Sequence, residues 1–169
     1  TFDEKDPARP VFRVHLQGPP VNDDVLAYLE GLPDLRILHI VYFNTVTYAG
    51  LVHVRGLKRL ERLNLEGTRV TDAAMDHLQG LTQLTRLELH ATGITDKALE
   101  KLAPLKNLIS LNLAFTDVSD AGIEQLMKFK NLRELNLEDT RVTAEGVKRL
   151  QQALPEWRIG STVVEIASV

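Results

Sequence analysis

Two histidines and two arginines are the side chains whose type and spacing could support binding chemistry. His15 and His39 are 24 residues apart, and so are Arg62 and Arg86. Two imidazoles on neighbouring strands, about 5 Å apart, could share a metal ion, and two guanidinium groups could grip an acidic group of a partner. The histidines lack a third ligand and a spacing motif, so we expect contact residues, no metal and no cofactor.

Hydroxyl and carboxylate side chains also recur, and their regularity indicates a structural role. Four threonines recur at 24-residue intervals: Thr68, Thr92, Thr116 and Thr140. A role repeated in every unit belongs to the scaffold, so we expect these hydroxyls to satisfy backbone groups in a turn. The pair Asp23–Asp24 sits at an expected helix start. The sequence also lacks G-x-S-x-G, H-E-x-x-H and a phosphate-binding glycine loop, so we expect no enzymatic activity.

Residues at this spacing come together only if the chain itself repeats, and it does. From Leu60 the sequence reads LERLNLEGTRVTDAAMDHLQGL, and three further copies follow at 24-residue steps: LTRLELHATGITDKALEKLAPL, LISLNLAFTDVSDAGIEQLMKF and LRELNLEDTRVTAEGVKRLQQA. Weaker copies start at Val11 and Leu35, and a truncated copy starts at Trp157. The Leu35 copy is expected to carry one extra residue within 41–43.

Each copy combines two hydrophobic periods. The L-x-L segment alternates as a half-buried strand does, and the spacing then changes to three and four, which favours a short helix. A unit of this size cannot bury its apolar side alone, whereas stacked copies can. With 28 leucines in 169 residues, the pattern predicts a stack of strand-plus-helix units whose strands form a parallel array.

The expected helices have recognisable start signals. A polar residue suited to cap the first backbone N–H groups precedes each one: Asn22, Thr47, Thr71, Thr95, Ser119 and Thr143. In four copies an aspartate follows, where the helix dipole favours a negative charge: Asp23, Asp72, Asp96 and Asp120. Small residues two or three positions later should allow close helix approach, among them Gly50, Gly122 and Gly146.

The motif L-x-x-L-x-L-x-x-T-x-[VI]-[TS]-[DA]-x-[AG] resembles the leucine-rich repeat family, in particular its threonine-bearing bacterial repeats and the repeats that follow F-box segments. The resemblance covers nearly the whole chain. It implies an α/β fold, namely an arc-shaped right-handed solenoid with a concave parallel sheet and short convex α-helices, and a protein-binding role. Pro19 and Asn44 depart from the threonine position, and no F-box segment is present in this sequence, which argues against a ubiquitin-ligase role for this chain.

Strand geometry separates core positions from surface positions. The leucines of L-x-L point into the core, so the residues between and beside them face the concave surface, where no packing rule fixes their chemistry. The candidate partner-binding residues are Arg13, His15, Ile37, His39, Val41, Tyr42, Phe43, Arg62, Asn64, Arg86, Glu88, His90, Glu134 and Glu138. The other concave positions are Gln17, Glu66, Ser110, Asn112, Ala114 and Asn136.

The Leu35 copy is richest in residues that anchor interfaces. Ile37 and Val41 flank His39, and the extra residue brings Tyr42 and Phe43 beside them; Tyr48 also replaces the helix-start aspartate. Aromatic residues are enriched in the energetic centres of interfaces. Two interpretations stand: this patch binds a partner, or residues 1–10 fold over it as a cap.

Charge is distributed unevenly along the same face. Three arginines lie toward the N-terminal side, and Glu134 and Glu138 lie toward the C-terminal side. Arg62 and Arg86 occupy the same position on adjacent strands, which is unfavourable unless a carboxylate neutralises them. The diagonal neighbours Glu66 and Glu88 are expected to do so; the alternative is an acidic group supplied by a partner.

Composition limits the classes of partner. The chain has 20 basic and 23 acidic residues and no cysteine, so it lacks a basic stripe for nucleic acid and any disulfide. No apolar run approaches the length of a membrane span. The chain starts at Thr1 without a methionine, which is typical of a chain with an upstream segment such as a signal peptide. The compartment is therefore left undetermined.

We expect one domain over residues 1–169, with an N-terminal cap or linker at 1–10, six repeats at 11–153, and a C-terminal cap and tail at 154–169. The expected function is a non-enzymatic, monomeric scaffold that binds another protein on the concave face. The alternative is the substrate-recognition arm of a larger assembly, such as a ubiquitin ligase or a secreted effector. A further alternative use of the C-terminal segment is edge pairing with another chain.

Overall fold

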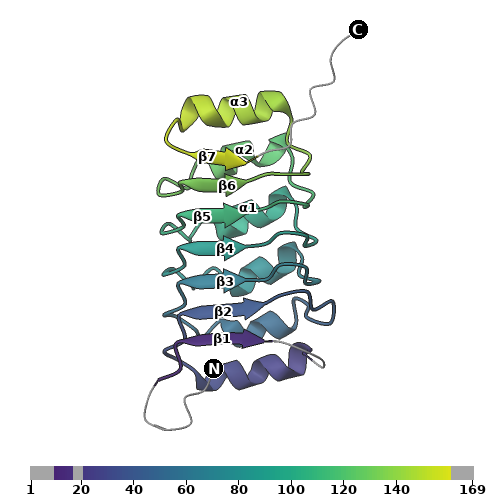
Figure 1. The fold of residues 1–169 in the computed structure, drawn as a ribbon, viewed down its shortest axis with the longest axis vertical. Helices are drawn as coiled ribbons and strands as arrows, with labels where there is room; N and C mark the ends of the chain where they lie inside the picture. Colours follow the sequence, from purple (N-terminus) through teal and green to yellow (C-terminus); the bar gives the residue numbers. More distant parts are fainter. Residues whose placement is uncertain (1–9, 17–20, 161–169) are drawn as a thin grey trace.

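A computed structural model describes residues 10–16 and 21–160 of the chain. Its centre is one parallel sheet of seven strands in sequence order (Figure 1). The strands are β1 (Arg13–Leu16), β2 (Ile37–Ile40), β3 (Arg62–Asn64), β4 (Arg86–Glu88), β5 (Ser110–Asn112), β6 (Glu134–Asn136) and β7 (Arg158–Gly160). Each copy of the sequence repeat therefore contributes one strand, and the truncated seventh copy contributes β7.

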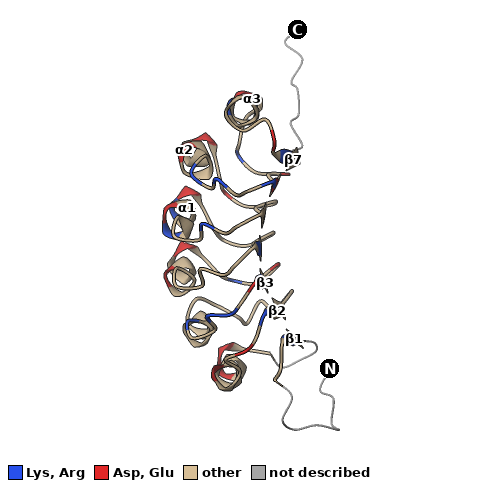
Figure 2. Cartoon of the chain, turned by 90° about the vertical axis from the view of Figure 1, so that its left-hand side faces the viewer, with Lys and Arg blue, Asp and Glu red and all other residues tan. Residues whose placement is uncertain are grey.

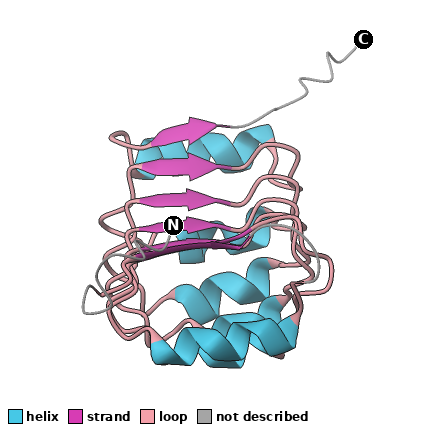
Figure 3. Cartoon of the chain, turned by 60° about the horizontal axis from the view of Figure 1, so that its bottom comes forward, coloured by secondary structure: helices cyan, strands magenta, loops and turns pink. Residues whose placement is uncertain are grey.

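Helical segments form a second layer behind the sheet, and the stack bends into a shallow arc with the helices on its outer side (Figures 2 and 3). Four of them are 3₁₀ helices: η1 (Asp23–Gly31), η2 (Gly50–Val54), η3 (Asp72–His77) and η4 (Asp120–Gly122). Three are α-helices: α1 (Asp96–Leu102), α2 (Ile123–Leu126) and α3 (Ala144–Ala153). The tighter 3₁₀ turn is common in short helical pieces. No helix of the described residues is long and apolar enough to cross a membrane.

The strand register places the leucines as the repeat predicts. Leu63 pairs with Leu87, and both are almost completely buried. One residue earlier in each strand, Arg62 pairs with Arg86, and both are exposed on the other face of the sheet. One continuous hydrophobic core runs from Val21 to residue 157, so the solenoid with one parallel sheet predicted from the sequence is confirmed.

The recurring threonines have the structural role expected of them. The Thr68 hydroxyl donates a hydrogen bond of 2.6 Å to the carbonyl oxygen of Leu65. Three other threonines make the same bond to the residue three positions earlier: Thr92, Thr116 and Thr140. The hydroxyl thus satisfies a backbone group at each turn from strand to helical segment.

The helix-start aspartates join neighbouring repeats, a role that the sequence pattern did not reveal. The Asp96 carboxylate accepts hydrogen bonds from the backbone N–H and the hydroxyl of Ser119, at 2.8 and 2.7 Å. Equivalent pairs connect Asp23 to Thr47, Asp72 to Thr95, and Asp120 to Thr143. A Cβ atom on Gly122 would lie 2.6 Å from an oxygen of Asp96, so the glycine makes room for this aspartate ladder.

Tyr48 interrupts the ladder. It stands where the other repeats have aspartate, and the Thr71 side chain caps no backbone N–H. The Tyr48 ring instead stacks on His77 of the next repeat, with 6.0 Å between ring centroids and 12° between planes. This side chain belongs to the helical layer, so it does not extend the concave patch around Tyr42.

The extra residue of the Leu35 copy lies later than expected. The β2–β3 register continues through Tyr42, whose backbone N–H donates to the Glu66 carbonyl, and the 24-residue offset resumes at Val46. The insertion therefore lies at 44–45, after the expected range 41–43. Phe43 takes the position that threonine has in later repeats, instead of Asn44, because its ring packs against the core there.

Several expectations fall on residues outside the described ranges. These are the N-terminal cap proposed for residues 1–10, except Pro10, which is exposed; the concave position of Gln17; the threonine position at Pro19; and edge pairing by the tail after residue 160. Within the described part, Trp157 is 7% exposed and closes the core beside β7.

Candidate functional site

The concave sheet surface presents three parallel rows of side chains. Strand pairing aligns Arg13, Ile37, Arg62, Arg86, Ser110, Glu134 and Arg158 in the first row, and His15, His39, Asn64, Glu88, Asn112, Asn136 and Gly160 in the second. The third row follows the strand ends and contains Val41, Glu66, His90, Ala114 and Glu138. Ser110 and Ala114 are 8% and 2% exposed, so their expected availability to a partner is wrong.

Three asparagines on the concave face accept hydrogen bonds from the backbone through their side chains. The Asn64 side-chain oxygen accepts a hydrogen bond of 2.8 Å from the Glu66 backbone N–H. Asn112 and Asn136 make the same bond to residues 114 and 138. The asparagines thus hold the strand ends in place.

Tyr42 forms an exposed aromatic platform at the end of β2. Its side chain is 70% exposed, and its backbone has φ of 60°. The ring covers Gly67, because a Cβ atom there would lie 2.6 Å from the Tyr42 Cδ1. The Tyr42 hydroxyl donates a hydrogen bond to the Glu66 carboxylate. The sequence-predicted patch therefore has one exposed anchor, Tyr42, whereas Phe43 is half-buried against the core.

Glu66 connects this platform to the next repeats. Its Oε1 lies 3.0 Å from Nδ1 of His90, whose ring meets Phe115 edge-on at 5.1 Å. Burial acts to raise the pKa of Glu66, but hydrogen bonds from Tyr42 and His90 act in the opposite direction, and the pKa is lowered from its ordinary value. An ionised Glu66 thus holds Tyr42 and His90 in fixed positions at neutral pH.

The basic end of the face has a different ion-pairing pattern from the one expected. The Arg86 guanidinium lies 3.7 Å from the Glu134 carboxylate, across β5. The Arg62 guanidinium makes no hydrogen bond or ion pair with any residue that the structure describes. The prediction that Glu66 and Glu88 neutralise the arginine pair is wrong for Arg86, because Glu66 is held by Tyr42 and His90.

His15 and His39 are neighbours, as predicted. They are register partners on β1 and β2, with their ring centroids 5.3 Å apart and their planes at 64°. Burial is the main cause that lowers the pKa of His39, and nearby cations lower it further, while Glu88 opposes this. Across residues 10–16 and 21–160, no three His, Cys, Asp or Glu side chains form a group that could hold a metal ion.

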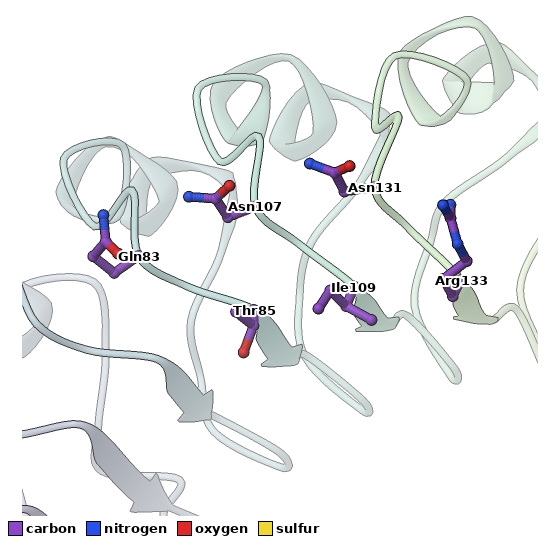
Figure 4. Close-up of a pocket in the computed structure, with 6 residues that line it drawn as sticks. All are labelled: Gln83, Thr85, Asn107, Ile109, Asn131 and Arg133. Atoms are coloured by element: carbon purple, nitrogen blue, oxygen red, sulfur yellow. The ribbon is translucent and has the colours of Figure 1, made fainter.

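A groove of about 420 Å³ lies where the chain enters β4, β5 and β6 (Figure 4). Its lining comes from three consecutive repeats: Gln83, Thr85, Asn107, Ile109, Asn131 and Arg133. The Asn107 and Asn131 amides each donate 2.9 Å hydrogen bonds to carbonyls of the preceding repeat. These polar groups therefore support the stack, and the groove is a weaker candidate than the concave face.

Sequence reasoning missed two contributors to the site, Phe115 and Ile109. Both are large and exposed, at 50% and 45%. Each is larger or more apolar than residues at the equivalent position of other repeats: Phe115 aligns with Gly67 and Ala91, and Ile109 aligns with Thr85. Comparing equivalent positions between repeats, rather than reading each strand alone, would have found them.

Comparisons with known proteins find similarity to leucine-rich repeat proteins in sequence and in fold. The family model described as Leucine Rich repeat matches residues 105–127 and 130–150. Internalin C2 from Listeria monocytogenes has a similar structure, with a TM-score of 0.63 and 25% identity over 80% of this chain and 55% of that chain. No curated protein sequence matches the chain.

A leucine-rich repeat protein from Leptospira interrogans also has a similar structure, with a TM-score of 0.64 and 20% identity. That match covers 88% of this chain and 36% of the other. The chain thus spans about half the length of one structural neighbour and about a third of the other. These similarities concern the repeat fold.

Proposed function

Because this chain matches a leucine-rich repeat model over two of its repeats and has the fold of leucine-rich repeat proteins, we propose that it is a non-enzymatic scaffold that binds another protein on its concave face. Leucine-rich repeat folds generally serve as protein-interaction scaffolds, and solenoids offer extended concave surfaces for this purpose. The proposal places the binding centre around Tyr42 and the rows of β1–β4. It treats residues 1–169 as one monomeric domain.

One observation carries this assignment: Tyr42 is exposed and yet held in place. Its ring is seated over Gly67, and its hydroxyl is bonded to Glu66. An aromatic side chain that is already ordered in the unbound protein is a favourable interface anchor, because it loses little conformational entropy on binding. Phe115, packed against His90, supplies a second aromatic contact on the same edge.

The decisive experiment replaces Tyr42 with Asp. Aspartate tolerates the positive φ of this position better than most residues, so the fold should persist. We expect the variant to lose capture of the specific partner in a pull-down analysed by mass spectrometry, while its circular dichroism spectrum stays unchanged. Val41→Asp, half-buried next to the platform, should act in the same direction.

Tyr28→Asp is the matched control, because Tyr28 is 83% exposed on η1 in the helical layer. It should capture the same partner as the wild type. If the Tyr42 and Tyr28 variants both retain the partner, the concave-face proposal is wrong. If both lose it, binding uses the helical side or depends on aromatic exposure in general.

The adaptor role remains an alternative within the same proposal. Since the structural neighbours extend beyond the length of this chain, the repeats would then act as the recognition arm of a larger protein. A catalytic or assembly domain in the full-length gene would favour that alternative. It would leave the concave face as the binding surface.

A further inference from the structure

We infer that the β1–β4 part of the concave face binds an acidic segment of a partner protein, with its carboxylates on a basic patch formed by Arg13, His15, His39 and Arg62. This inference rests on the proposed function and specifies the partner's chemistry. It depends on how the strand register groups these four side chains, not on any one of them.

The patch collects cations from three adjacent strands. Arg13, Ile37 and Arg62 are successive register partners, and the His15–His39 pair lies in the neighbouring row. Arg13 and Arg62 are both exposed, and the Arg62 guanidinium bonds to no described residue. Its guanidinium fork therefore keeps its donors available for a carboxylate, and such charge-assisted pairs are among the stronger polar contacts.

Carboxylates near the patch are few and mostly engaged. Glu66 is held by Tyr42 and His90, and Glu61 pairs with Arg36 at 2.9 Å. Glu88 is half-buried on β4 and acts on His39 from two strands away. Across β1–β3, the described strand residues include no acid, so the local charge there is positive.

The negative charge at the β6 end of the concave face indicates which kind of anionic partner can bind at the β1–β4 end. Glu134 and Glu138 are exposed at β6, and a long polyanion such as nucleic acid would be repelled there. A protein segment can instead be acidic over β1–β4 and neutral or basic over β6. Four strands span about 14 Å, which an extended segment of about five residues covers.

Histidine gives this patch a pH signature. Burial and nearby cations lower the pKa of His39, so its imidazole gains a proton only below the pH range usual for histidine; the charged groups that face it are Arg13 and His15 from β1, Arg62 from β3 and Glu88 from β4. Added positive charge repels the arginines in the free protein and attracts a bound carboxylate. Binding of an acidic segment should therefore strengthen between about pH 7 and pH 5, where most glutamate side chains are still ionised.

The test uses fluorescein-labelled peptides and fluorescence anisotropy at low salt. A peptide of about six glutamates is compared with its glutamine counterpart and with a hexathymidine oligonucleotide. We expect the glutamate peptide alone to bind, with an affinity that falls at least about tenfold in Arg62→Glu. Lys97→Glu, the same charge change on α1 in the helical layer, should bind as the wild type does.

A double variant, His15→Gln with His39→Gln, isolates the pH effect. It should keep its affinity at about pH 7 and lose the strengthening at about pH 5. Equal binding of hexathymidine, or equal affinity of wild type and Arg62→Glu, would overturn the inference. If the peptide fails to bind while Tyr42-dependent capture of a protein persists, this inference falls and the proposed function stands.

Discussion

At the scale of single residues, the function proposed here depends on backbone positions that force side chains outward. Tyr42, Gly67, Ala91, Phe115 and Asp139 all have positive φ, between 48° and 65°. They occupy the same position in successive repeats, so the turn itself imposes this conformation. Glycine adopts it without steric cost, and the other residues do so at some expense. The chain uses this corner to present Tyr42 and Phe115 beside small neighbours.

Gly67→Ala tests whether the small neighbour matters. The added Cβ would meet the Tyr42 ring and would itself be strained at φ of 65°, so we expect a loss of about 1–2 kcal/mol in stability and weaker partner binding. Ala91→Gly, at the equivalent position with φ of 52°, should leave binding unchanged and gain up to about 1 kcal/mol. Urea denaturation and the pull-down measure both effects; a neutral Gly67→Ala would contradict the seating of Tyr42.

At the scale of elements, neighbouring repeats are joined by two kinds of polar contact in the helical layer. The aspartate ladder connects one helical start to the next, with the interruption at Tyr48. Surface ion pairs join the same repeats on the outside, for example Lys101 with Asp76 at 2.8 Å. The ladder is half-buried and accepts backbone hydrogen bonds, so it should contribute more than the exposed pairs.

Asp96→Ala and Asp76→Ala separate these two contributions. Removing the Asp96 carboxylate leaves the Ser119 N–H and hydroxyl without their acceptor, and we expect a loss of about 1–3 kcal/mol in unfolding free energy. Removing the exposed Asp76 carboxylate should cost less than about 1 kcal/mol. Equilibrium denaturation in urea gives both values. Equal losses would mean that the ladder is no stronger than a surface ion pair.

At the scale of the whole molecule, a single hydrophobic core passes through every described repeat. Each repeat contacts mainly its neighbours, so cooperativity depends on the strength of these interfaces. The chain contains one tryptophan, and Trp157 lies in the last repeat of the core. Its fluorescence therefore reports on one end of the stack, while circular dichroism reports on the whole.

Leu87→Ala tests whether the stack unfolds as one unit. Leu87 is fully buried in the central strand β4, so its truncation should cost about 2–5 kcal/mol. We expect the tryptophan and circular dichroism transitions to move together to lower denaturant. Val52→Ala, a 39% exposed position on η2, should move neither by more than about 0.5 kcal/mol. A tryptophan transition that stays in place would show that the ends unfold independently.

The sequence by itself determined the solenoid, the strand register and the orientation of each leucine. These follow from periodicity within one repeat, because alternation decides which face of a strand is buried, and copies at a constant interval must align. For that reason the pairing of His15 with His39 and of Arg62 with Arg86 was predictable. The structural role of the threonines was predictable on the same ground.

Only the tertiary structure decided which polar groups meet between repeats. Glu66 could reach toward the arginines or toward Tyr42, and Arg86 could pair with Glu88 or with Glu134; the sequence spacing allows each of these. The observed choice depends on the turn that follows β2, on the space over Gly67 and on the curvature that brings β4 and β6 together. Such contacts between long side chains depend on three-dimensional packing, and no local period encodes them.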